Sequence, residues 1–395
     1  MTGRTAAEAP AADVVVVGAG PVGLLLAGEL RLGGARVTVL EQLVEPATES
    51  RASTLHSRTL EILEDRGVLR RLGALPDGGP GHFGGLRLDL AEAEPGHPHA
   101  GQWKCPQTRL EAVLQLWATG LGAHVRRGQR VTGLTVLPHR VEVAHTGDDG
   151  TAHRTTAAFV VGCDGERSTV RRLGGFELTG EDGTLEMLRA DVAGIDVPDR
   201  RFERHPHGLA TAHRWPDGST RVMVHLFGAP PARRTGPPSF AEVAAAWAAV
   251  TGEDIGHGTP LWLNAFDNTS RQVTAYRRGR VLLAGDAAHV QMPVGGQALN
   301  LGLQDAAALG PRLAARVTGR AGDDELDAYH RERHPVAARV LTGIRAQARL
   351  LLGGPEVDGV REVIAGLLRL GTVRRHLARV VTGLDTPRPP ASTGS

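Results

Sequence analysis

The chain has 395 residues, of which 41% are hydrophobic, and its 45 basic residues against 43 acidic ones leave a formal net charge of +2. This length and composition predict two or three domains with a large core, and they argue against low-complexity disorder. The sequence contains no run of about 18 apolar residues and no basic stripe, so we expect a protein that neither spans a membrane nor binds nucleic acid.

The first elements form a complete βαβ unit. Asp13–Val17 contains four consecutive valines, which is typical of a strand buried on both faces of a parallel sheet. A glycine-rich turn, Gly18–Gly23, leads into Leu24–Leu32, which has helical composition. Arg36–Leu40 is a second valine-rich strand, and it ends at Glu41.

The turn of this unit has the spacing GxGxxG, which is typical of dinucleotide binding. We expect Gly18 to allow the tight turn, Gly20 to let the backbone approach a pyrophosphate, and Gly23 to let the helix pack closely. Glu41 stands where a carboxylate can bind a ribose hydroxyl. A second GxGxxG match, Gly79–Gly84, follows a loop and precedes a strand-like segment, so we interpret it as an ordinary loop.

The next elements continue the α/β pattern. Ser57–Leu72 reads as one amphipathic helix and Thr108–Trp117 as another. Phe159–Val161 is a short apolar strand that leads into Gly162-Cys163-Asp164-Gly165. On its own, that motif is better explained as a plain Asp-Gly turn.

The middle of the chain changes pattern. From Phe176 to Val273, alternating segments such as Arg221–Leu226 are separated by turn signals such as Pro216-Asp217-Gly218, which predicts antiparallel hairpins. Phe240–Val250 reads as a helix within this region. We therefore expect a mostly antiparallel insertion between two α/β segments.

The buried-strand pattern returns at Arg280–Ala284, and Gly285-Asp286-Ala287-Ala288-His289 follows it directly. Asp286 could bind a ribose or ribitol hydroxyl at the strand end. The backbone amides of Gly295–Leu299 open a helix that starts near Asn300, and they could bind the edge of a flat heteroaromatic ring. Two further helical segments, Asp324–Leu341 and Val357–Val381, complete the pattern.

The order GxGxxG, then DG, then GDAAH…PxGGQ-x-LNxGxQDA, together with RASTLHSRTLEIL and RQVTAYRRGRVLLAGDAAH, resembles a known family. The chain is similar over about residues 13–385 to the FAD-dependent aromatic hydroxylases, single-component flavoprotein monooxygenases typified by para-hydroxybenzoate hydroxylase. The nearest resemblance is to the branch that acts on aromatic polyketides. Many members of that branch continue into a thioredoxin-like domain, which we do not expect here because the sequence stops at Ser395.

The resemblance implies FAD as the cofactor and assigns a role to each matching position. The implied pyrophosphate residues are Gly18, Gly20, Val22 and Gly23, and the implied adenosine contacts are Glu41, Gln42 and Val131. The implied contacts to the rest of the dinucleotide and to the flavin are Arg51, Gln107, Asp286, Pro293, Gly295, Gly296, Gln297, Leu299 and Asn300. The resemblance also implies that Asp164 serves both FAD and NADPH, and that Pro293 takes part in flavin movement.

The resemblance further implies NAD(P)H- and O2-dependent hydroxylation of a polycyclic aromatic substrate through a C4a-hydroperoxyflavin. NAD(P)H would dock transiently, since no second glycine fingerprint stands in a βαβ setting. Baeyer–Villiger oxygenation on the same scaffold, and a flavin-binding partner protein without oxygenase turnover, are the alternatives. We expect no metal, a monomer or homodimer, and a cytoplasmic location, because the two cysteines lie far apart and no signal-peptide pattern begins the sequence.

These inferences predict an α/β fold with a discontinuous, Rossmann-like FAD-binding domain. We expect its two parts at residues 1–175 and 276–385, the second including C-terminal helices. A substrate-binding domain of mainly antiparallel sheet would span residues 176–275. Residues 386–395 are predicted to form a disordered tail.

Overall fold

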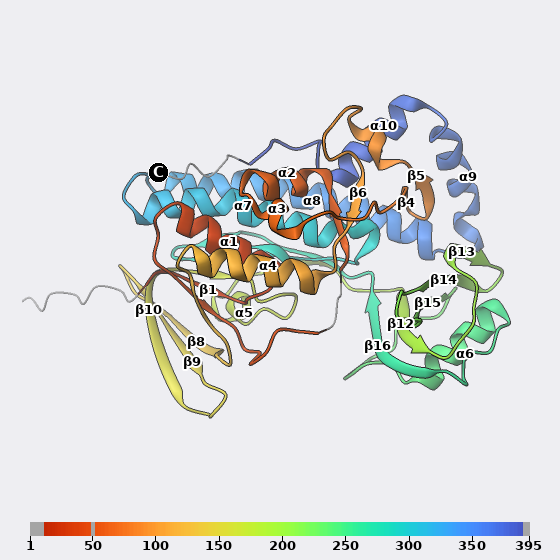
Figure 1. The fold of residues 1–395 in the computed structure, drawn as a ribbon, viewed down its shortest axis with the longest axis horizontal. Coiled ribbons are helices and arrows are strands. Elements are labelled where there is room, and N and C mark those ends of the chain that lie inside the picture. The colour runs from red at the N-terminus through yellow and green to blue at the C-terminus, as the bar shows by residue number, and fades with distance from the viewer. Residues whose placement is uncertain (1–11, 49–51, 390–395) are drawn as a thin grey trace, which may run out of the picture.

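The computed structural model describes residues 12–48 and 52–389, which form a larger α/β body and a smaller antiparallel lobe (Figure 1). The body is built on an eight-stranded sheet. Its main path is β18 (Arg277–Arg278), β19 (Val281–Leu283), β10 (Ala152–Gly162), β1 (Ala12–Val17), β2 (Val37–Leu40) and β7 (His124–Arg126). From β10 the sheet also extends antiparallel into β9 (Val141–Thr146) and β8 (Arg130–Val136).

The four central strands β19, β10, β1 and β2 run parallel to one another and are covered by helices. The helices of the body are α1 (Pro21–Leu32), α2 (Ser57–Asp65), α3 (Val68–Leu72), α4 (Gln107–Gly120), α5 (Thr169–Leu173), α7 (Gln297–Val317) and α8 (Asp324–Leu352). Val14, Val15 and Val16 are fully buried in this core, as expected for a parallel sheet enclosed on both faces. Helices α1 and α4 pack so closely at Gly28 that a side chain at this position would overlap the Trp117 ring.

The smaller lobe is a five-stranded antiparallel sheet covered on one face by α6 (Phe240–Thr251). The strand order is β13 (Arg200–His205), β14 (Gly208–Arg214), β15 (Thr220–Leu226), β12 (Glu186–Ala193) and β16 (Thr259–Asp267). Val222, Val224 and the fully buried Trp247 belong to a separate hydrophobic core between this sheet and α6. The opposite face of the sheet meets the body.

Several short elements join the two parts. Strands β11 (Leu178–Glu181), β17 (Ser270–Val273) and β20 (His289–Val290) form a small antiparallel sheet at the junction. On the inner face of the lobe, Met187 and Leu209 pack against Met292 and Val294 from the loop that precedes α7. The predicted fold class, a parallel Rossmann-like sheet with an antiparallel insertion, is confirmed.

Two small two-stranded sheets and two C-terminal helices complete the body. Strand β3 (Thr54–His56) pairs with β6 (Gln102–Lys104), and β4 (Gly81–Phe83) pairs with β5 (Leu86–Leu88). Helices α9 (Asp358–Leu367) and α10 (Gly371–Thr382) follow α8, so the single helix predicted over Val357–Val381 is divided in two. Because β4 lies within the second GxGxxG match, that segment is a strand of a hairpin and not only a loop.

Two further predictions need correction. The helix predicted over Ser57–Leu72 breaks at Gly67, whose φ of +67° is a left-handed conformation that ends α2 before α3 begins. The start of the predicted tail is packed, because Arg58 Nη2 donates to the Thr386 carbonyl at 2.8 Å and Arg388 pairs with Asp65. The remainder of that tail, residues 390–395, lies outside the described residues.

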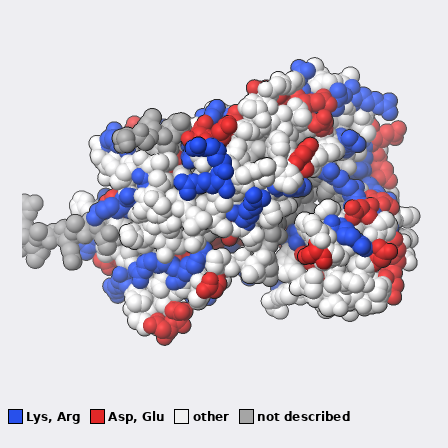
Figure 2. Space-filling model, in the orientation of Figure 1, with Lys and Arg blue, Asp and Glu red and all other residues white. Residues whose placement is uncertain are grey.

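None of the helices in the described part of the chain is both long enough and apolar enough to cross a membrane. Figure 2 shows acidic and basic side chains mixed in small groups over one face of the molecule.

Candidate active site

The glycine turn between β1 and α1 is shaped by backbone packing. Gly18 has φ +103°, and a side chain there would overlap the carbonyl oxygen of Cys163. Its amide donates to the Leu40 carbonyl at 2.8 Å, which ties the turn to the end of β2. A side chain at Gly23 would overlap the Gly18 carbonyl, so α1 can start this close to the turn only with glycine at both positions.

Gly20 differs from its two neighbours in the motif. It is the N-cap of α1, with φ −73°, and no heavy atom lies within 4 Å of the position that a Cβ would occupy. The protein itself therefore leaves room for a side chain here. The open space lies at the helix N-terminus, where free amides and the helix dipole favour an anionic group. This arrangement fits the pyrophosphate of FAD.

Glu41 lies beside this turn at the end of β2. Its Oε2 accepts from the Ala19 amide at 2.7 Å, and its Oε1 accepts from the Leu43 amide at 2.9 Å. Each carboxylate oxygen can accept more than one hydrogen bond, so the side chain can hold the turn and a ribose hydroxyl together. Gln42 is exposed, and its Oε1 accepts from Arg130 at 2.7 Å.

Val131 and Arg51 are the other two residues expected near this end of the dinucleotide. Val131 is buried in β8, next to a bulge in its pairing with β9. Arg51 lies outside the described residues, so its expected contact with the dinucleotide stays a prediction.

We expect Glu41→Ala to weaken FAD binding by about 1–3 kcal/mol, because a charged hydrogen-bond acceptor is lost from the dinucleotide site. The measurement is a fluorescence titration of the FAD-free protein with FAD. Glu45→Ala, an exposed change four residues further along, is the control and should bind as the wild type does. Equal affinities for both variants would show that Glu41 holds only its own backbone.

The loop after β10 carries Asp164, and the structure gives its carboxylate a capping role. Ser168 Oγ donates to Oδ1, and the amides of Thr169 and Val170 donate to Oδ2 at 2.7 and 3.0 Å. Burial raises the pKa of Asp164 although these hydrogen bonds oppose that shift. The plain Asp-Gly turn thus has a clear structural function, and a contact with FAD or NADPH would be additional to it.

The loop after β19 brings Asp286 to the surface. Residues 281–290 are buried with the exception of Asp286, which sits in a single 3-10 turn, Gly285–Ala287. Gly285 and Gly302 both pack against Val22 of α1, where a Cβ on either would lie about 3 Å from the valine. The start of α1, this loop and the start of α7 therefore meet at one point.

Glu166 lies in the loop after β10, two residues beyond Asp164. Burial raises the pKa of Glu166, and the nearby Asp286 and Asp267 raise it further. Asp267 of β16 and Arg167 of the Asp164 loop line one cleft, so the edge of the antiparallel lobe approaches the loop that follows β10.

The loop between β20 and α7 has two consecutive glycines in the left-handed conformation, Gly295 with φ +65° and Gly296 with φ +70°. Pro293 before them is exposed, whereas Leu299 is half-buried. The first amides of α7 have no acceptor within the helix and remain available to a ligand. This loop can therefore present backbone donors to the edge of a flavin ring.

The side chains of Asn300 and Gln297 hold this loop in place through hydrogen bonds. Asn300 Oδ1 accepts from the His56 amide at 2.9 Å, and its Nδ2 donates to the carbonyls of Thr54 and Gly296 at 3.0 and 2.7 Å. Gln297 is buried and accepts from Gln347 of α8 at 2.9 Å. Asn300 was expected at the flavin ring, and here its side chain serves to hold β3 against the glycine loop.

Gln107 occupies the first position of α4. Its amide donates to the Ala52 carbonyl at 2.9 Å, and its side-chain nitrogen donates to Glu111 at 2.8 Å. The residue thus anchors the segment that leads from residue 52 into β3, the strand that Asn300 also binds. Its expected contact with FAD stays a prediction.

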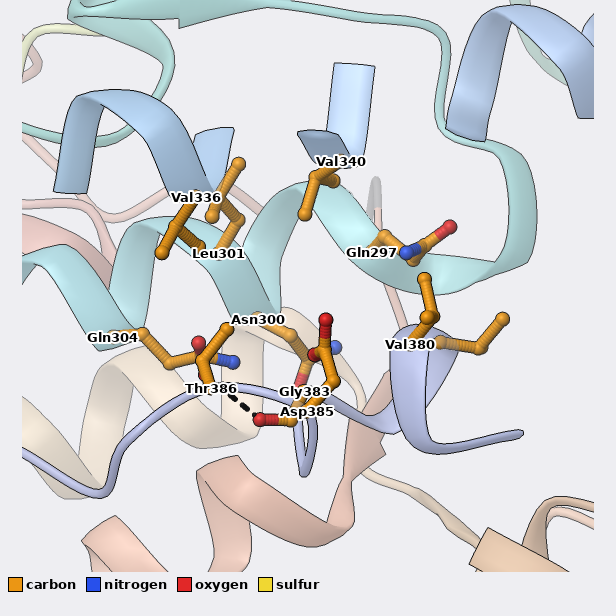
Figure 3. A pocket seen from close by; sticks show the side chains of 11 residues that line it. Gln297, Asn300, Leu301, Gln304, Val336, Val340, Val380, Gly383, Asp385 and Thr386 are labelled. Atoms are coloured by element: carbon orange, nitrogen blue, oxygen red, sulfur yellow. Dashed lines mark hydrogen bonds between the residues drawn. The ribbon is translucent and has the colours of Figure 1, made fainter. Parts of the chain in front are cut away.

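A small pocket lies between α7 and the C-terminal segment (Figure 3). Asn300 and Gln304 line it together with Asp385 and Thr386, whose hydroxyl donates to the Gly383 carbonyl at 2.9 Å. The pocket measures about 20 Å³, which is room for about one water molecule and not for a cofactor.

A buried ionic network that the sequence analysis did not find supports the cofactor loops. Asp305 of α7 is fully buried; its Oδ1 accepts from Arg333 Nε at 2.8 Å and its Oδ2 from His289 Nε2 at 2.7 Å. The same carboxylate accepts from the Gly285 amide at 3.2 Å. His289 is thus a structural residue, and the network holds the loop that carries Asp286. In the sequence, Asp305 directly follows the LNxGxQ motif, and this position is the one signal that could have indicated its role.

A cleft of about 840 Å³ lies along β16. Its lining includes Trp262, Asn264 and Phe266 of that strand, and Arg167 from the Asp164 loop on the side of the body. This volume suits a drug-sized ligand, and the aromatic side chains suit a flat one. Within residues 12–48 and 52–389, no group of three His, Cys, Asp or Glu side chains is arranged to hold a metal ion.

Comparison with known proteins gives consistent matches over nearly the whole chain. Residues 11–343 match a family model described as "FAD binding domain". The 12-dehydrotetracycline 5-monooxygenase/anhydrotetracycline 6-monooxygenase of Streptomyces rimosus subsp. rimosus is 41% identical over 400 aligned positions, covering 96% of this chain and 78% of that protein. The rifampicin monooxygenase of Streptomyces venezuelae is 40% identical, covering 94% of this chain and 79% of that protein.

Solved structures give the same result. The crystal structure of CabE, an aromatic hydroxylase from angucycline biosynthesis, is 48% identical and superposes with a TM-score of 0.91. The match covers 95% of this chain and 76% of CabE.

Proposed function

The chain belongs to the FAD-binding domain family and is a FAD-dependent aromatic monooxygenase, and from this premise we propose that it hydroxylates a polycyclic, polyketide-type aromatic substrate with NAD(P)H and O2. One observation carries the proposal. The glycine turn, the Asp286 loop and the start of α7 meet at Val22, and the glycine turn also packs at Gly18 against the Asp164 loop, whose Arg167 lines the aromatic cleft along β16. Cofactor loops and substrate cleft are therefore neighbours.

Each of the cofactor loops would bind a different part of FAD. The amides at Gly20 would receive the pyrophosphate, Glu41 the adenosine ribose, and Asp286 the ribityl region. The glycine loop, Gly295 and Gly296, would present its amides to the edge of the flavin ring. Supporting this division, Gly20 leaves open space at a helix N-terminus and Asp286 is exposed between buried neighbours.

When bound, FAD supplies the redox and oxygen chemistry, and the chain orients the cofactor and the substrate and keeps water away from them. The antiparallel sheet would cover the substrate, with Trp262 and Phe266 against its flat face and water excluded from the cleft. We propose the same division of the chain that the sequence predicts, with residues 176–275 as the substrate domain. The separate core beneath α6 supports this division.

NAD(P)H has no glycine fingerprint of its own, so it has to approach the flavin from the side that the substrate also uses. We therefore expect the site to open for reduction and to close for oxygenation. A bound aromatic substrate that favours the open state should speed flavin reduction by NADPH well beyond the rate without substrate. Stopped-flow measurement of flavin bleaching, with and without a tetracyclic polyphenol, tests this expectation.

The matched control in that experiment is a benzoate that is too small to fill the cleft. If the polyphenol leaves the reduction rate unchanged, the substrate does not control access to the flavin. Release of the bound chromophore by heat also has to yield FAD, and FMN in its place would contradict the roles of Gly20 and Glu41.

A further inference from the structure

Gln347 of α8 lies against the glycine loop that precedes α7. Its side-chain nitrogen donates to Gln297 Oε1 at 2.9 Å, and its own Oε1 accepts from the Gly84 amide at 3.4 Å. A Cβ on Gly295 would lie 3.5 Å from Gln347 Oε1 and 3.7 Å from Gln297 Oε1, so both side chains border this glycine. Gln347 is only 1% exposed, and its hydrogen bonds are therefore sheltered from water.

The glycine loop needs such support because its own backbone is free to move. Gly295 and Gly296 are adjacent and both have a positive φ, and two glycines in a row leave the chain free to adopt other conformations. Asn300 binds the Gly296 carbonyl, whereas the two glutamines border Gly295. The pair Gln347 and Gln297 therefore fixes the part of the loop that lies beyond the Asn300 hydrogen bonds.

The C-terminal end of α8 is bound by side chains of the antiparallel lobe. Arg204 of β13 donates to the carbonyls of Gly353 and Gly354 at 2.8 and 3.1 Å. His225 Nε2 of β15 lies 2.9 Å from the carbonyl oxygen of Leu352, the last residue of the helix. Carbonyls at a helix C-terminus have no donor within the helix and favour a positive charge, so these contacts attach the lobe to α8.

The same part of α8 connects the lobe with the glycine loop. Leu351 belongs to one buried apolar cluster with Leu209 of the lobe and Val294 of the loop. Gln347 lies about one turn before Leu351 on the helix. Because a helix moves as a rigid unit over such a length, a shift of the lobe at the end of α8 would move Gln347, and with it the loop.

The attachment to α8 and the substrate cleft lie at opposite edges of the lobe. The strand order runs from β13, which carries Arg204, to β16, which lines the cleft. The strands between them are hydrogen-bonded to one another, so we expect the sheet to turn as one body. A movement of β16 over the cleft would therefore be accompanied by a rotation at the end of α8.

We propose that Gln347 is a positioning residue for the flavin. Through Gln297 it holds Gly295 in the arrangement that binds the flavin ring, and it passes the position of the antiparallel lobe on to this loop. The inference rests on the proposed function, because it takes the glycine loop as the binding site of the ring. A substrate that changes the position of the lobe would thereby change the position of the flavin.

The test measures two properties of each variant, the FAD affinity and the exposure of the bound flavin ring, which is read as the constant for quenching of its fluorescence by iodide. Gln347→Met keeps the length of the side chain and removes its hydrogen bonds. Arg204→Gln weakens the attachment of the lobe, and a double variant combines both changes. Gln304→Met is the matched control, because Gln304 is also a buried glutamine but lines the small pocket beside the C-terminal segment.

Gln347→Met should weaken FAD binding about tenfold, because the loop is no longer held in its binding arrangement. It should also raise the iodide quenching constant. Arg204→Gln should raise this constant in the otherwise wild-type protein and leave it unchanged in the Gln347→Met background, since both changes break one connection. Two changes that act independently would instead give additive effects. Gln304→Met should keep the FAD affinity and the quenching constant of the wild type.

An unchanged quenching constant in Gln347→Met, equal effects of Gln304→Met, or additive effects of Gln347→Met and Arg204→Gln would overturn the proposal. Thermal unfolding of the FAD-free variants shows whether they fold. Gln347→Asn, which shortens the side chain and draws it away from Gln297, replaces Gln347→Met if that variant does not retain FAD. The experiment uses neither an aromatic substrate nor NADPH, so a failure of the oxygenation test would leave its result unchanged.

Discussion

Asp305→Ala should lower the free energy of unfolding by about 3–5 kcal/mol, because it leaves the buried Arg333 guanidinium without its carboxylate. The same change removes the acceptor of the Gly285 amide, so the loop that carries Asp286 loses its support and FAD binding should weaken as well. Urea unfolding of the FAD-free protein measures the first effect, and FAD titration measures the second.

The control is Asp327→Ala, which breaks an ion pair with Arg277 at the surface, where the aspartate side chain is 56% exposed. That change should cost no more than about 1 kcal/mol. A similarly small effect at Asp305 would show that the buried network is not needed for stability.

The Asp305 network also predicts a pH dependence of stability. Burial alone would raise the pKa of Asp305, but Arg333 and His289 hold it below its ordinary value of 3.8. The carboxylate therefore contributes stability above pH 3.8, and this contribution is lost as the pH falls through the lower pKa of the folded state. Asp305→Asn should flatten the acid limb of the stability curve relative to the wild type.

Gly20→Val should abolish tight FAD binding while the protein stays folded. The Cβ position of Gly20 meets no protein atom within 4 Å, so the branched side chain would stand in the space proposed for the pyrophosphate. We expect FAD affinity to fall by at least about 100-fold. The FAD-free protein should lose no more than about 1 kcal/mol of stability, the cost of a less favourable N-cap.

Gly120→Val is the matched control, because Gly120 is exposed at the end of α4 and also has no atom within 4 Å of its Cβ position. It should bind FAD as the wild type does. If Gly20→Val binds FAD normally, the pyrophosphate does not lie over the N-terminus of α1. If its FAD-free form unfolds, the position is structural.

The sequence predicts those features of the site that arise within one short segment. Gly18 and Gly23 take up the positions expected of them because strand, turn and helix follow one another directly. The break at Gly67 was missed because the apolar spacing of Ser57–Leu72 continues through it, and only the backbone conformation ends α2 there.

Features that depend on contacts between distant segments could not be predicted in this way. Asp305 and Arg333 are 28 positions apart on two helices, and only the packing of α7 on α8 brings their charges together. Asn300 follows the glycine loop in sequence, but its hydrogen bonds to β3 depend on a strand more than 240 residues away.

The central claim is that this chain transfers one oxygen atom from O2 to a polycyclic aromatic substrate. The most direct measurement incubates the FAD-loaded protein with NADPH, a tetracyclic polyphenol and oxygen-18 gas, and reads the product by mass spectrometry. We predict a product that has gained one oxygen-18 atom as a new hydroxyl group on the ring. Consumption of NADPH with hydrogen peroxide as the sole product, or recovery of unlabelled substrate, would contradict the claim.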